Sequence, residues 1–202
     1  MIIINKQEFL SETVLFTFAL ASEAAAVFKN CNTLITGIGK VNAAYELTKR
    51  IQQQRPALII NLGSAGSRIF QKGEVVCCTR FIQRDMDVRG LGYAHYETPL
   101  SGIPAVLEYG TGMEGLPGGT CGTGDHFETS LSEQPYDVVD MEAYALALTA
   151  MKEGIPFLCL KYISDGADDT AAEDWTVQVH KAAEAYGRLF GLTQPAVPAA
   201  GI

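Results

Sequence analysis

Five residues in the second half of the chain combine acidic chemistry with positions at the ends of apolar runs. Asp140, Met141 and Glu142 follow two valines, and Ser164 and Asp165 follow a Tyr-Ile pair. Short apolar runs of this kind are typical of buried strands. Because open α/β sheets bind ligands beyond the carboxyl ends of their strands, we expect both acidic segments at one crevice. Such carboxylates suit a reaction in which one group holds hydroxyls and another moves a proton.

A third carboxylate and a small-residue turn follow two earlier apolar runs. Glu23 is expected in the first turn of a helix, where the macrodipole stabilises its ionised form by roughly 0.3–1 kcal/mol. Ser64, Ala65 and Gly66 end the run that begins at residue 57, and their N–H and hydroxyl groups could cradle an oxygen-bearing ligand. Taken alone, Glu23 is better explained as a helix-start glutamate and the Gly/Ser segment as a tight structural turn.

The segment 122–128, with the sequence Gly-Thr-Gly-Asp-His-Phe-Glu, places an aromatic ring in a loop. Phe127 could offer a stacking face to a flat ligand, a contact worth about 1–3 kcal/mol for bases in nucleic-acid systems, or could belong to the core. His126, between Asp125 and Glu128, superficially suggests a metal site. Consecutive loop residues rarely converge on one ion, so we predict no metal here.

The turn 37–40, Gly-Ile-Gly-Lys, follows a strand pattern and opens a helix pattern, which invites a nucleotide-binding interpretation. A dinucleotide fingerprint needs glycine at the position of Asn42, and a P-loop needs glycine at Leu34 and Ser or Thr at Val41. Both motifs are therefore rejected, and a tight strand-to-helix turn remains.

Length and charge exclude several classes of protein. The 202 residues fit one domain, 1–202, with a flexible tail expected at 193–202. A net charge of −8 with 15 Lys+Arg offers no footprint for a nucleic-acid backbone and disfavours anionic membranes. No apolar run approaches the roughly 20 residues that span a bilayer. The five cysteines, without C-x-x-C spacing, predict buried thiols in a cytoplasmic protein.

The order of elements predicts an α/β three-layer sandwich with a central mixed, mostly parallel sheet, because strand and helix patterns alternate. The middle, residues 84–124, is rich in Gly and Pro and predicts an antiparallel excursion with loops. Strands are expected at 13–19, 32–36, 57–62, 75–82, 104–109, 138–141 and 157–163, and helices at 22–29, 41–54, 142–152 and 171–190.

Taken in order, these segments resemble the nucleoside phosphorylase superfamily, and most closely its hydrolytic branch, the 5′-methylthioadenosine/S-adenosylhomocysteine nucleosidases. The resemblance covers most of residues 16–190, with a shortened middle. It implies a nucleosidase that hydrolyses the N-ribosidic bond of a purine nucleoside and needs neither metal nor organic cofactor. It also implies a homodimer, in which a loop like 88–99 completes the 5′ end of the neighbouring pocket.

The resemblance also implies roles for individual residues. Glu23 would deprotonate the water that attacks C1′, and Asp165 would protonate purine N7, which requires a proton on a carboxyl that burial keeps neutral. Glu142 would hold the ribose hydroxyls. Glu128 departs from the family pattern, where an apolar residue is usual. The predicted site comprises Glu23 and Asp165 as catalytic residues, with Ser64, Ala65, Gly66, Phe127, Glu128, Asp140, Met141, Glu142 and Ser164 binding the substrate.

Three alternatives remain open at this stage. A purine nucleoside phosphorylase would need cations for phosphate, and Arg68, Arg84 and Arg89 are the candidates. A futalosine hydrolase would differ at the 5′ substituent, which Arg89 could meet if it is not simply solvated. A catalytically silent nucleoside-binding protein would keep the pocket without turnover.

Overall fold

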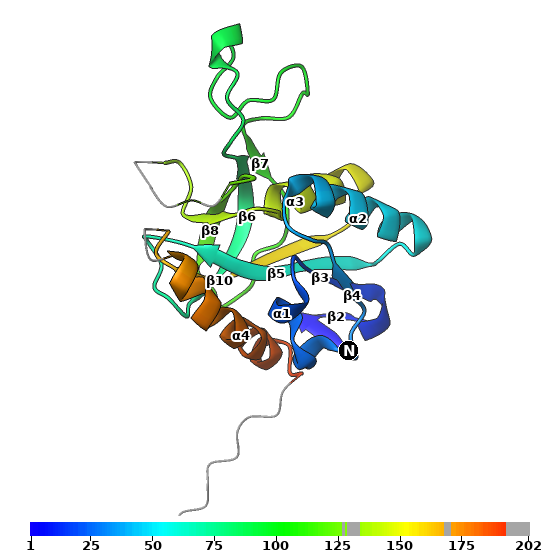
Figure 1. Ribbon diagram of the computed structural model, residues 1–202. Coiled ribbons are helices and arrows are strands. Elements are labelled where there is room, and N and C mark those ends of the chain that lie inside the picture. The colour runs from blue at the N-terminus through cyan, green and yellow to red at the C-terminus, as the bar shows by residue number, and fades with distance from the viewer. Residues whose placement is uncertain (127, 129–133, 168–170, 193–202) are drawn as a thin grey trace, which may run out of the picture.

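A central mixed sheet carries helices on both of its faces (Figure 1). The computed structural model describes residues 1–126, 128, 134–167 and 171–192, the side chains of 171–177, 179 and 180 excepted. Parallel pairings join β3 to β4 and β5, β5 to β10, and β8 to β6 and β9, whereas β10–β6, β5–β9 and β6–β7 are antiparallel. The sheet strands are β3 (Val14–Phe18), β4 (Thr33–Ile35), β5 (Leu58–Gly66), β6 (Val75–Gln83), β7 (Val106–Glu108), β8 (Gly118–Thr123), β9 (Val138–Asp140) and β10 (Phe157–Asp165).

Part of this sheet closes on itself. The strands β10, β6, β8, β9 and β5 are neighbours in that order, and β10 also pairs with β5. The register of the closing pair places Lys161 opposite Gly63 and Tyr162 opposite Ser64. The ends of β5, β9 and β10 therefore meet around one point.

Two pairs of helices cover the sheet: α2 (Lys40–Gln53) and α3 (Ala143–Glu153) on one face, α1 (Ala21–Ala24) and α4 (Ala171–Leu189) on the other (Figure 1). Successive strand residues alternate between the two layers, so Leu15 packs under α2 and α3 while Phe16 packs under α4. Burial on both faces explains the continuous apolar runs in the strands. Each fully buried side chain of this size contributes roughly 1.5–3 kcal/mol.

The predicted fold class is confirmed, and local differences have physical reasons. The strand β8 was missed because its sequence, Gly-Gly-Thr-Cys-Gly-Thr, lacks the bulky residues that mark strands. Its glycines are needed, because a Cβ at Gly122 would lie 2.6 Å from the ring of Tyr136. The helix expected at 22–29 is divided at Ala25, whose φ is 46°, into α1 and the 3₁₀ turn η2 (Ala26–Phe28).

Two segments lie outside the main sheet. Strands β1 (Ile2–Ile4) and β2 (Gln7–Phe9) form an antiparallel hairpin after the first residue, preceding the 3₁₀ turn η1 (Ser11–Thr13). The segment between β6 and β7 extends away from the sheet as an arm, which includes the 3₁₀ turn η3 (Arg89–Leu91) (Figure 1, green). Among the described residues, no helix is both long and apolar enough to cross a membrane. The predicted tail at 193–202 lies outside the described residues.

Candidate active site

A cavity of about 260 Å³ lies where the ends of β5, β9 and β10 meet α1. Phe127, the predicted stacking residue, lies outside the described residues. Six lining residues do not belong to the predicted site: Ala19, Leu20, Ile38, Arg84, His126 and Val139. The other ten predicted residues all line this cavity: Glu23, Ser64, Ala65, Gly66, Glu128, Asp140, Met141, Glu142, Ser164 and Asp165.

The carboxylate of Glu23 is buried, with 4% of the residue exposed, and three donors fix its two oxygens. Oε1 accepts the backbone N–H of Ser64 at 2.9 Å and the hydroxyl of Ser64 at 2.8 Å. Oε2 accepts the N–H of Leu20 at 3.1 Å, which closes the first turn of α1. The Gly-Ser turn and the helix-start glutamate therefore form one unit, in which charge-assisted hydrogen bonds hold the carboxylate.

Glu142 reaches across to the turn before α2. Its Oε1 accepts the N–H of Gly39 at 2.8 Å, so the Gly-Ile-Gly-Lys turn contributes a donor to the site. Gly39 has a φ of 92°, a conformation that favours glycine. Burial, followed by the nearby charge of Asp140, raises the pKa of Glu142 to about 8. Glu142 is therefore a carboxyl that holds a proton more strongly than an exposed glutamate.

A buried ion pair supports this edge of the cavity. Lys161 Nζ lies 2.8 Å from Asp140 Oδ2, and the side chains are 2% and 1% exposed. Burial opposes ionisation of Asp140, but the charge of Lys161 outweighs it and keeps the pKa of Asp140 below its usual value. Lys161 was not among the predicted site residues. Its signal in the sequence is a single lysine within the apolar run 157–163.

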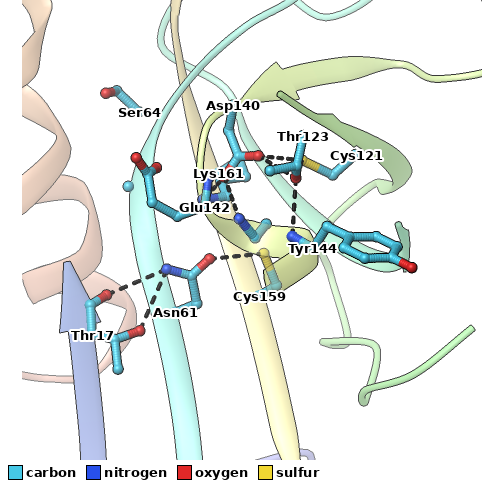
Figure 2. Close-up of polar contacts among 12 residues, drawn as sticks. Thr17, Asn61, Ser64, Cys121, Thr123, Asp140, Glu142, Tyr144, Cys159 and Lys161 are labelled. Atoms are coloured by element: carbon cyan, nitrogen blue, oxygen red, sulfur yellow. Dashed lines mark hydrogen bonds and ion pairs between the residues drawn. The ribbon is translucent and has the colours of Figure 1, made fainter. Parts of the chain in front are cut away.

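Asp140 also connects three elements, as Figure 2 shows for its contacts with β8 and β10. Oδ1 accepts the hydroxyl of Thr123 at 2.6 Å and the thiol of Cys121 at 3.3 Å. Oδ2 accepts the N–H of Ala143 at 2.8 Å and so satisfies a donor at the start of α3. Asp140 lines the cavity, but these contacts occupy its carboxylate and make it an anchor for the residues on either side.

Asp165 ends β10 beside Gly66, the last residue of β5. Its Oδ2 accepts the hydroxyl of Ser164 at 2.7 Å, and its Oδ1 accepts the N–H of Ala167 at 2.9 Å. A Cβ at Gly66 would lie 2.5 Å from Asp165 Oδ1, closer than real Cβ contacts come. Glycine at position 66 therefore makes the placement of the Asp165 carboxyl possible.

A second buried cation lies in the wall of the cavity. The side chain of Arg84 is 2% exposed, and its Nη1 donates to Glu128 Oε2 at 3.2 Å. The same guanidinium contacts both the ring and the carbonyl oxygen of His126. The polar residue at 128, unusual for the resembled family, therefore meets a buried partner on the neighbouring loop.

Arg68 and Arg89, the other two candidates for binding phosphate, do not share the position of Arg84 in the cavity wall. The Arg89 side chain is 60% exposed, and its Nη2 lies 2.6 Å from Asp87 Oδ2 within the arm. Neither Arg68 nor Arg89 lines the cavity as the described residues form it. His126 and Glu128 approach within 3.5 Å of each other, but no cluster of metal-ligand side chains occurs among the described residues.

Comparison with known proteins places this arrangement in a family. The family model described as the Phosphorylase superfamily matches residues 27–117 and 118–191. The chain therefore belongs to the phosphorylase superfamily. Within it, the chain is similar to the 5′-methylthioadenosine/S-adenosylhomocysteine nucleosidases. The nucleosidase of that name from Exiguobacterium sp. is 35% identical over 164 residues, which cover 68% of each chain.

Solved structures give the same class of fold. The 5′-methylthioadenosine/S-adenosylhomocysteine nucleosidase of Neisseria meningitidis, in complex with methylthio-immucillin-A, has a TM-score of 0.75 and 25% identity. The match covers 90% of this chain and 97% of that one. The futalosine hydrolase of Helicobacter pylori has a TM-score of 0.78 over 89% of this chain and 95% of its own, with 19% identity. At that identity the likeness concerns the fold alone.

Proposed function

We propose that the protein is a purine nucleosidase, an N-glycosyl hydrolase that releases free base from a nucleoside such as 5′-methylthioadenosine or S-adenosylhomocysteine. The observation that carries the proposal is the meeting of three carboxyl groups, Glu23, Glu142 and Asp165, around one cavity. Each is held by separate donors, so each keeps its own place and environment. The similarity to the nucleosidase of Exiguobacterium sp. supports the same reaction.

The proposed reaction uses these groups in one displacement. The C1′–N9 bond breaks and its electron pair moves into the purine, while Asp165 transfers a proton to N7. The oxygen of a water molecule bonds to C1′, and Glu23 takes the proton that this water loses. General acid–base transfers of this kind contribute typically about 10²–10⁴-fold each. Glu142 holds the ribose hydroxyls so that the water and the leaving base are aligned.

Water, not phosphate, is the proposed nucleophile because of Glu23. The carboxylate is buried beside Ser64, where a water at C1′ would need a proton acceptor. A phosphate dianion at about 4 Å would meet a repulsion of roughly 4 kcal/mol per unit charge at an effective dielectric near 20. Arg84 lines the cavity but is already bonded to Glu128, so its charge is partly compensated.

The test is a panel of nucleosides incubated with and without phosphate, with free base measured by reverse-phase chromatography. The panel contains 5′-methylthioadenosine, adenosylhomocysteine, a futalosine-like compound and plain nucleosides. The proposal expects base release at a rate independent of phosphate. A ribose 1-phosphate product would instead establish a phosphorylase, and binding without turnover would establish a silent binding protein.

A matched pair of variants locates the base that activates water. Glu23→Gln removes the proton acceptor but keeps the shape of the side chain, so turnover should be lost while nucleoside binding remains. Glu12→Gln makes the same chemical change at an exposed position in η1 and should leave turnover unchanged. Equal activity of both variants would remove Glu23 from the mechanism.

We also propose that the enzyme is a cytoplasmic homodimer. Val41 and Tyr45, 78% and 63% exposed, are four residues apart and so share one face of α2, while Ile38, 48% exposed in the turn before α2, lines the cavity. Leu91 in the arm is 74% exposed. Exposed apolar residues grouped in this way are typical of protein contacts. Sedimentation of an active monomer at micromolar concentration would contradict the dimer.

The proposed cytoplasmic location is supported by the cysteines. All five are free thiols, which fits a reducing compartment.

A further inference from the structure

A tyrosine hydroxyl from α4 is inserted between β5 and β10, next to the catalytic edge. Tyr186 is fully buried, and its hydroxyl accepts the backbone N–H of Tyr162 at 2.8 Å. The same hydroxyl donates to the carbonyl oxygen of Gly63 at 2.8 Å, and the carbonyl oxygen of Leu160 is a second acceptor at 3.1 Å. One side chain therefore bridges backbone groups of two parallel strands.

The strand register places this bridge next to residues that hold the carboxyl groups of the site. Gly63 is opposite Lys161, and Ser64 is opposite Tyr162, so the hydroxyl lies at the level where each strand turns into the site. Along β5 the next residue is Ser64, whose N–H and hydroxyl hold Glu23. Along β10 the bridge lies beside Lys161, which holds Asp140.

The helix that carries Tyr186 contacts the elements of both proton-transfer groups. It packs against α1, which carries Glu23, against β5, and against β10, which ends in Asp165. Figure 1 shows α4 lying along this face of the sheet beside α1. A Cβ at Gly63 would lie 3.5 Å from both Glu23 Oε1 and Lys161 Nζ, so the bridged residue is a near neighbour of both charges.

We propose that Tyr186 is a positioning residue: its hydroxyl sets the separation of β5 and β10, and so the distance between the water-activating unit Glu23–Ser64 and the proton donor Asp165. The inference rests on the proposed nucleosidase function. Tyr186 is not among the residues that line the cavity, so it does not contact the substrate. It acts through the backbones of Gly63 and Tyr162, which carry the site residues on either side.

Removal of the Tyr186 hydroxyl should affect catalysis as well as stability. Without the hydroxyl, the Tyr162 N–H and the Gly63 carbonyl would lose a buried partner, and the strands would adjust to satisfy them. A shift of about 1 Å in a reacting group can cost about 10²-fold in rate. The proposed ribose-binding carboxyl, Glu142, accepts its hydrogen bond from Gly39 in the turn before α2 and not from this bridge, so substrate affinity should change little.

The experiment compares Tyr186→Phe with Tyr109→Phe in base-release assays on the whole enzyme. Tyr109 is a half-buried tyrosine whose hydroxyl donates to the Ile155 carbonyl oxygen at 2.7 Å, away from the cavity, so its loss measures stability alone. Both variants should lower Tm, by roughly 2–8 °C, and Tyr186→Phe by more than Tyr109→Phe because the Tyr186 hydroxyl both accepts and donates a hydrogen bond. Only Tyr186→Phe should lower kcat, by about tenfold or more, with KM within about twofold.

Incorporation of 3-fluorotyrosine at position 186 keeps the hydroxyl and should keep kcat near that of the wild type. Equal kcat values for Tyr186→Phe and Tyr109→Phe, at temperatures where both are folded, would overturn the proposal. Absence of base release from the wild-type enzyme would instead overturn the nucleosidase function on which it rests.

Discussion

Lys161 Nζ and Asp140 Oδ2 are 2.8 Å apart and their side chains are almost fully buried, one on β10 and the other at the end of β9. The pair joins the strand that ends in Asp165, the proposed proton donor, to the strand that precedes Glu142, the proposed ribose-binding carboxyl. A buried pair of this kind is costly to break, because the remaining charge keeps its desolvation penalty. Substitution of either partner should therefore lower the free energy of unfolding strongly.

Replacing Lys161 by methionine should strongly destabilise the protein. Asp140 would lose its counter-charge, and breaking a buried pair in this way costs about 3–5 kcal/mol. Chemical denaturation would measure the loss, with Lys152→Met, an exposed lysine of α3, as the control. The double variant Lys161→Met with Asp140→Leu should recover part of the stability. A loss as small as that of Lys152→Met would contradict the paired state.

The raised pKa of Glu142, about 8, gives the free enzyme a specific dependence on pH. The pKa of a glutamate in an unfolded chain is about 4.3. Between that pH and about pH 8 the folded state therefore binds more protons than the unfolded state. The free energy of unfolding should therefore fall as pH rises through this window. Glu142→Gln should show a flatter profile from pH 5 to 9. Parallel profiles for the two proteins would show that Glu142 does not titrate in this range.

Asp165→Asn should fold normally but lose about 10²–10⁴-fold in kcat, the usual range for removal of a general acid. The amide can keep the contact with the Ala167 N–H, so structure and binding should persist. Glu46→Gln, on α2, makes the same chemical change away from the cavity. Rapid turnover by folded Asp165→Asn would remove this residue from proton transfer.

Gly66→Ala tests the placement of Asp165 without altering its chemistry. The added methyl would lie 2.5 Å from Asp165 Oδ1 and 3.0 Å from the Cβ of Ala167, so the carboxyl must move. We expect a fall in kcat of about 10²-fold, as for a displacement near 1 Å. Gly112→Ala, where a methyl meets open space, is the matched control. Similar kcat values for both variants would falsify the close contact.

Glu128→Leu should expose the dependence of Arg84 on its carboxylate partner. The guanidinium would remain buried at 2% exposure with one fewer acceptor, and unpaired buried charge destabilises by several kcal/mol in order of magnitude. The replacement restores the apolar residue usual in the resembled family, so base release should persist in the folded fraction. Thermal unfolding monitored beside Glu108→Leu, an exposed glutamate of β7, would measure the difference.

Much of this arrangement could be predicted from the sequence because the relevant signals are local. The acids at strand ends, such as Asp140 and Asp165, follow apolar runs whose direction fixes where they emerge. Lys161 and Tyr186 could not be found in this way. Each acts on residues of another element, and a lysine in a strand or a tyrosine in a helix carries no local sign of its partner.

The division of helix 22–29 and the strand β8 escaped prediction for a related reason. Ala25 adopts a φ of 46° although alanine favours helices, so tertiary contacts override its local preference. In β8, glycine is required by the ring of Tyr136, which packs where a side chain would be. Both features depend on neighbours distant in the sequence.

The closed ring of strands has a consequence for how the protein acquires its site. Among the described residues β10 is the last strand, yet it pairs with both β5 and β6 and so completes the ring. Contacts across such long sequence separations form slowly, because the chain entropy is lost before the contacts are gained. During synthesis the ring cannot close before β10 has emerged, because β10 supplies the pairings with both β5 and β6. Completion of the cavity therefore depends on the two segments that emerge late: β10, which closes the ring, and α4, whose Tyr186 bridges β5 and β10.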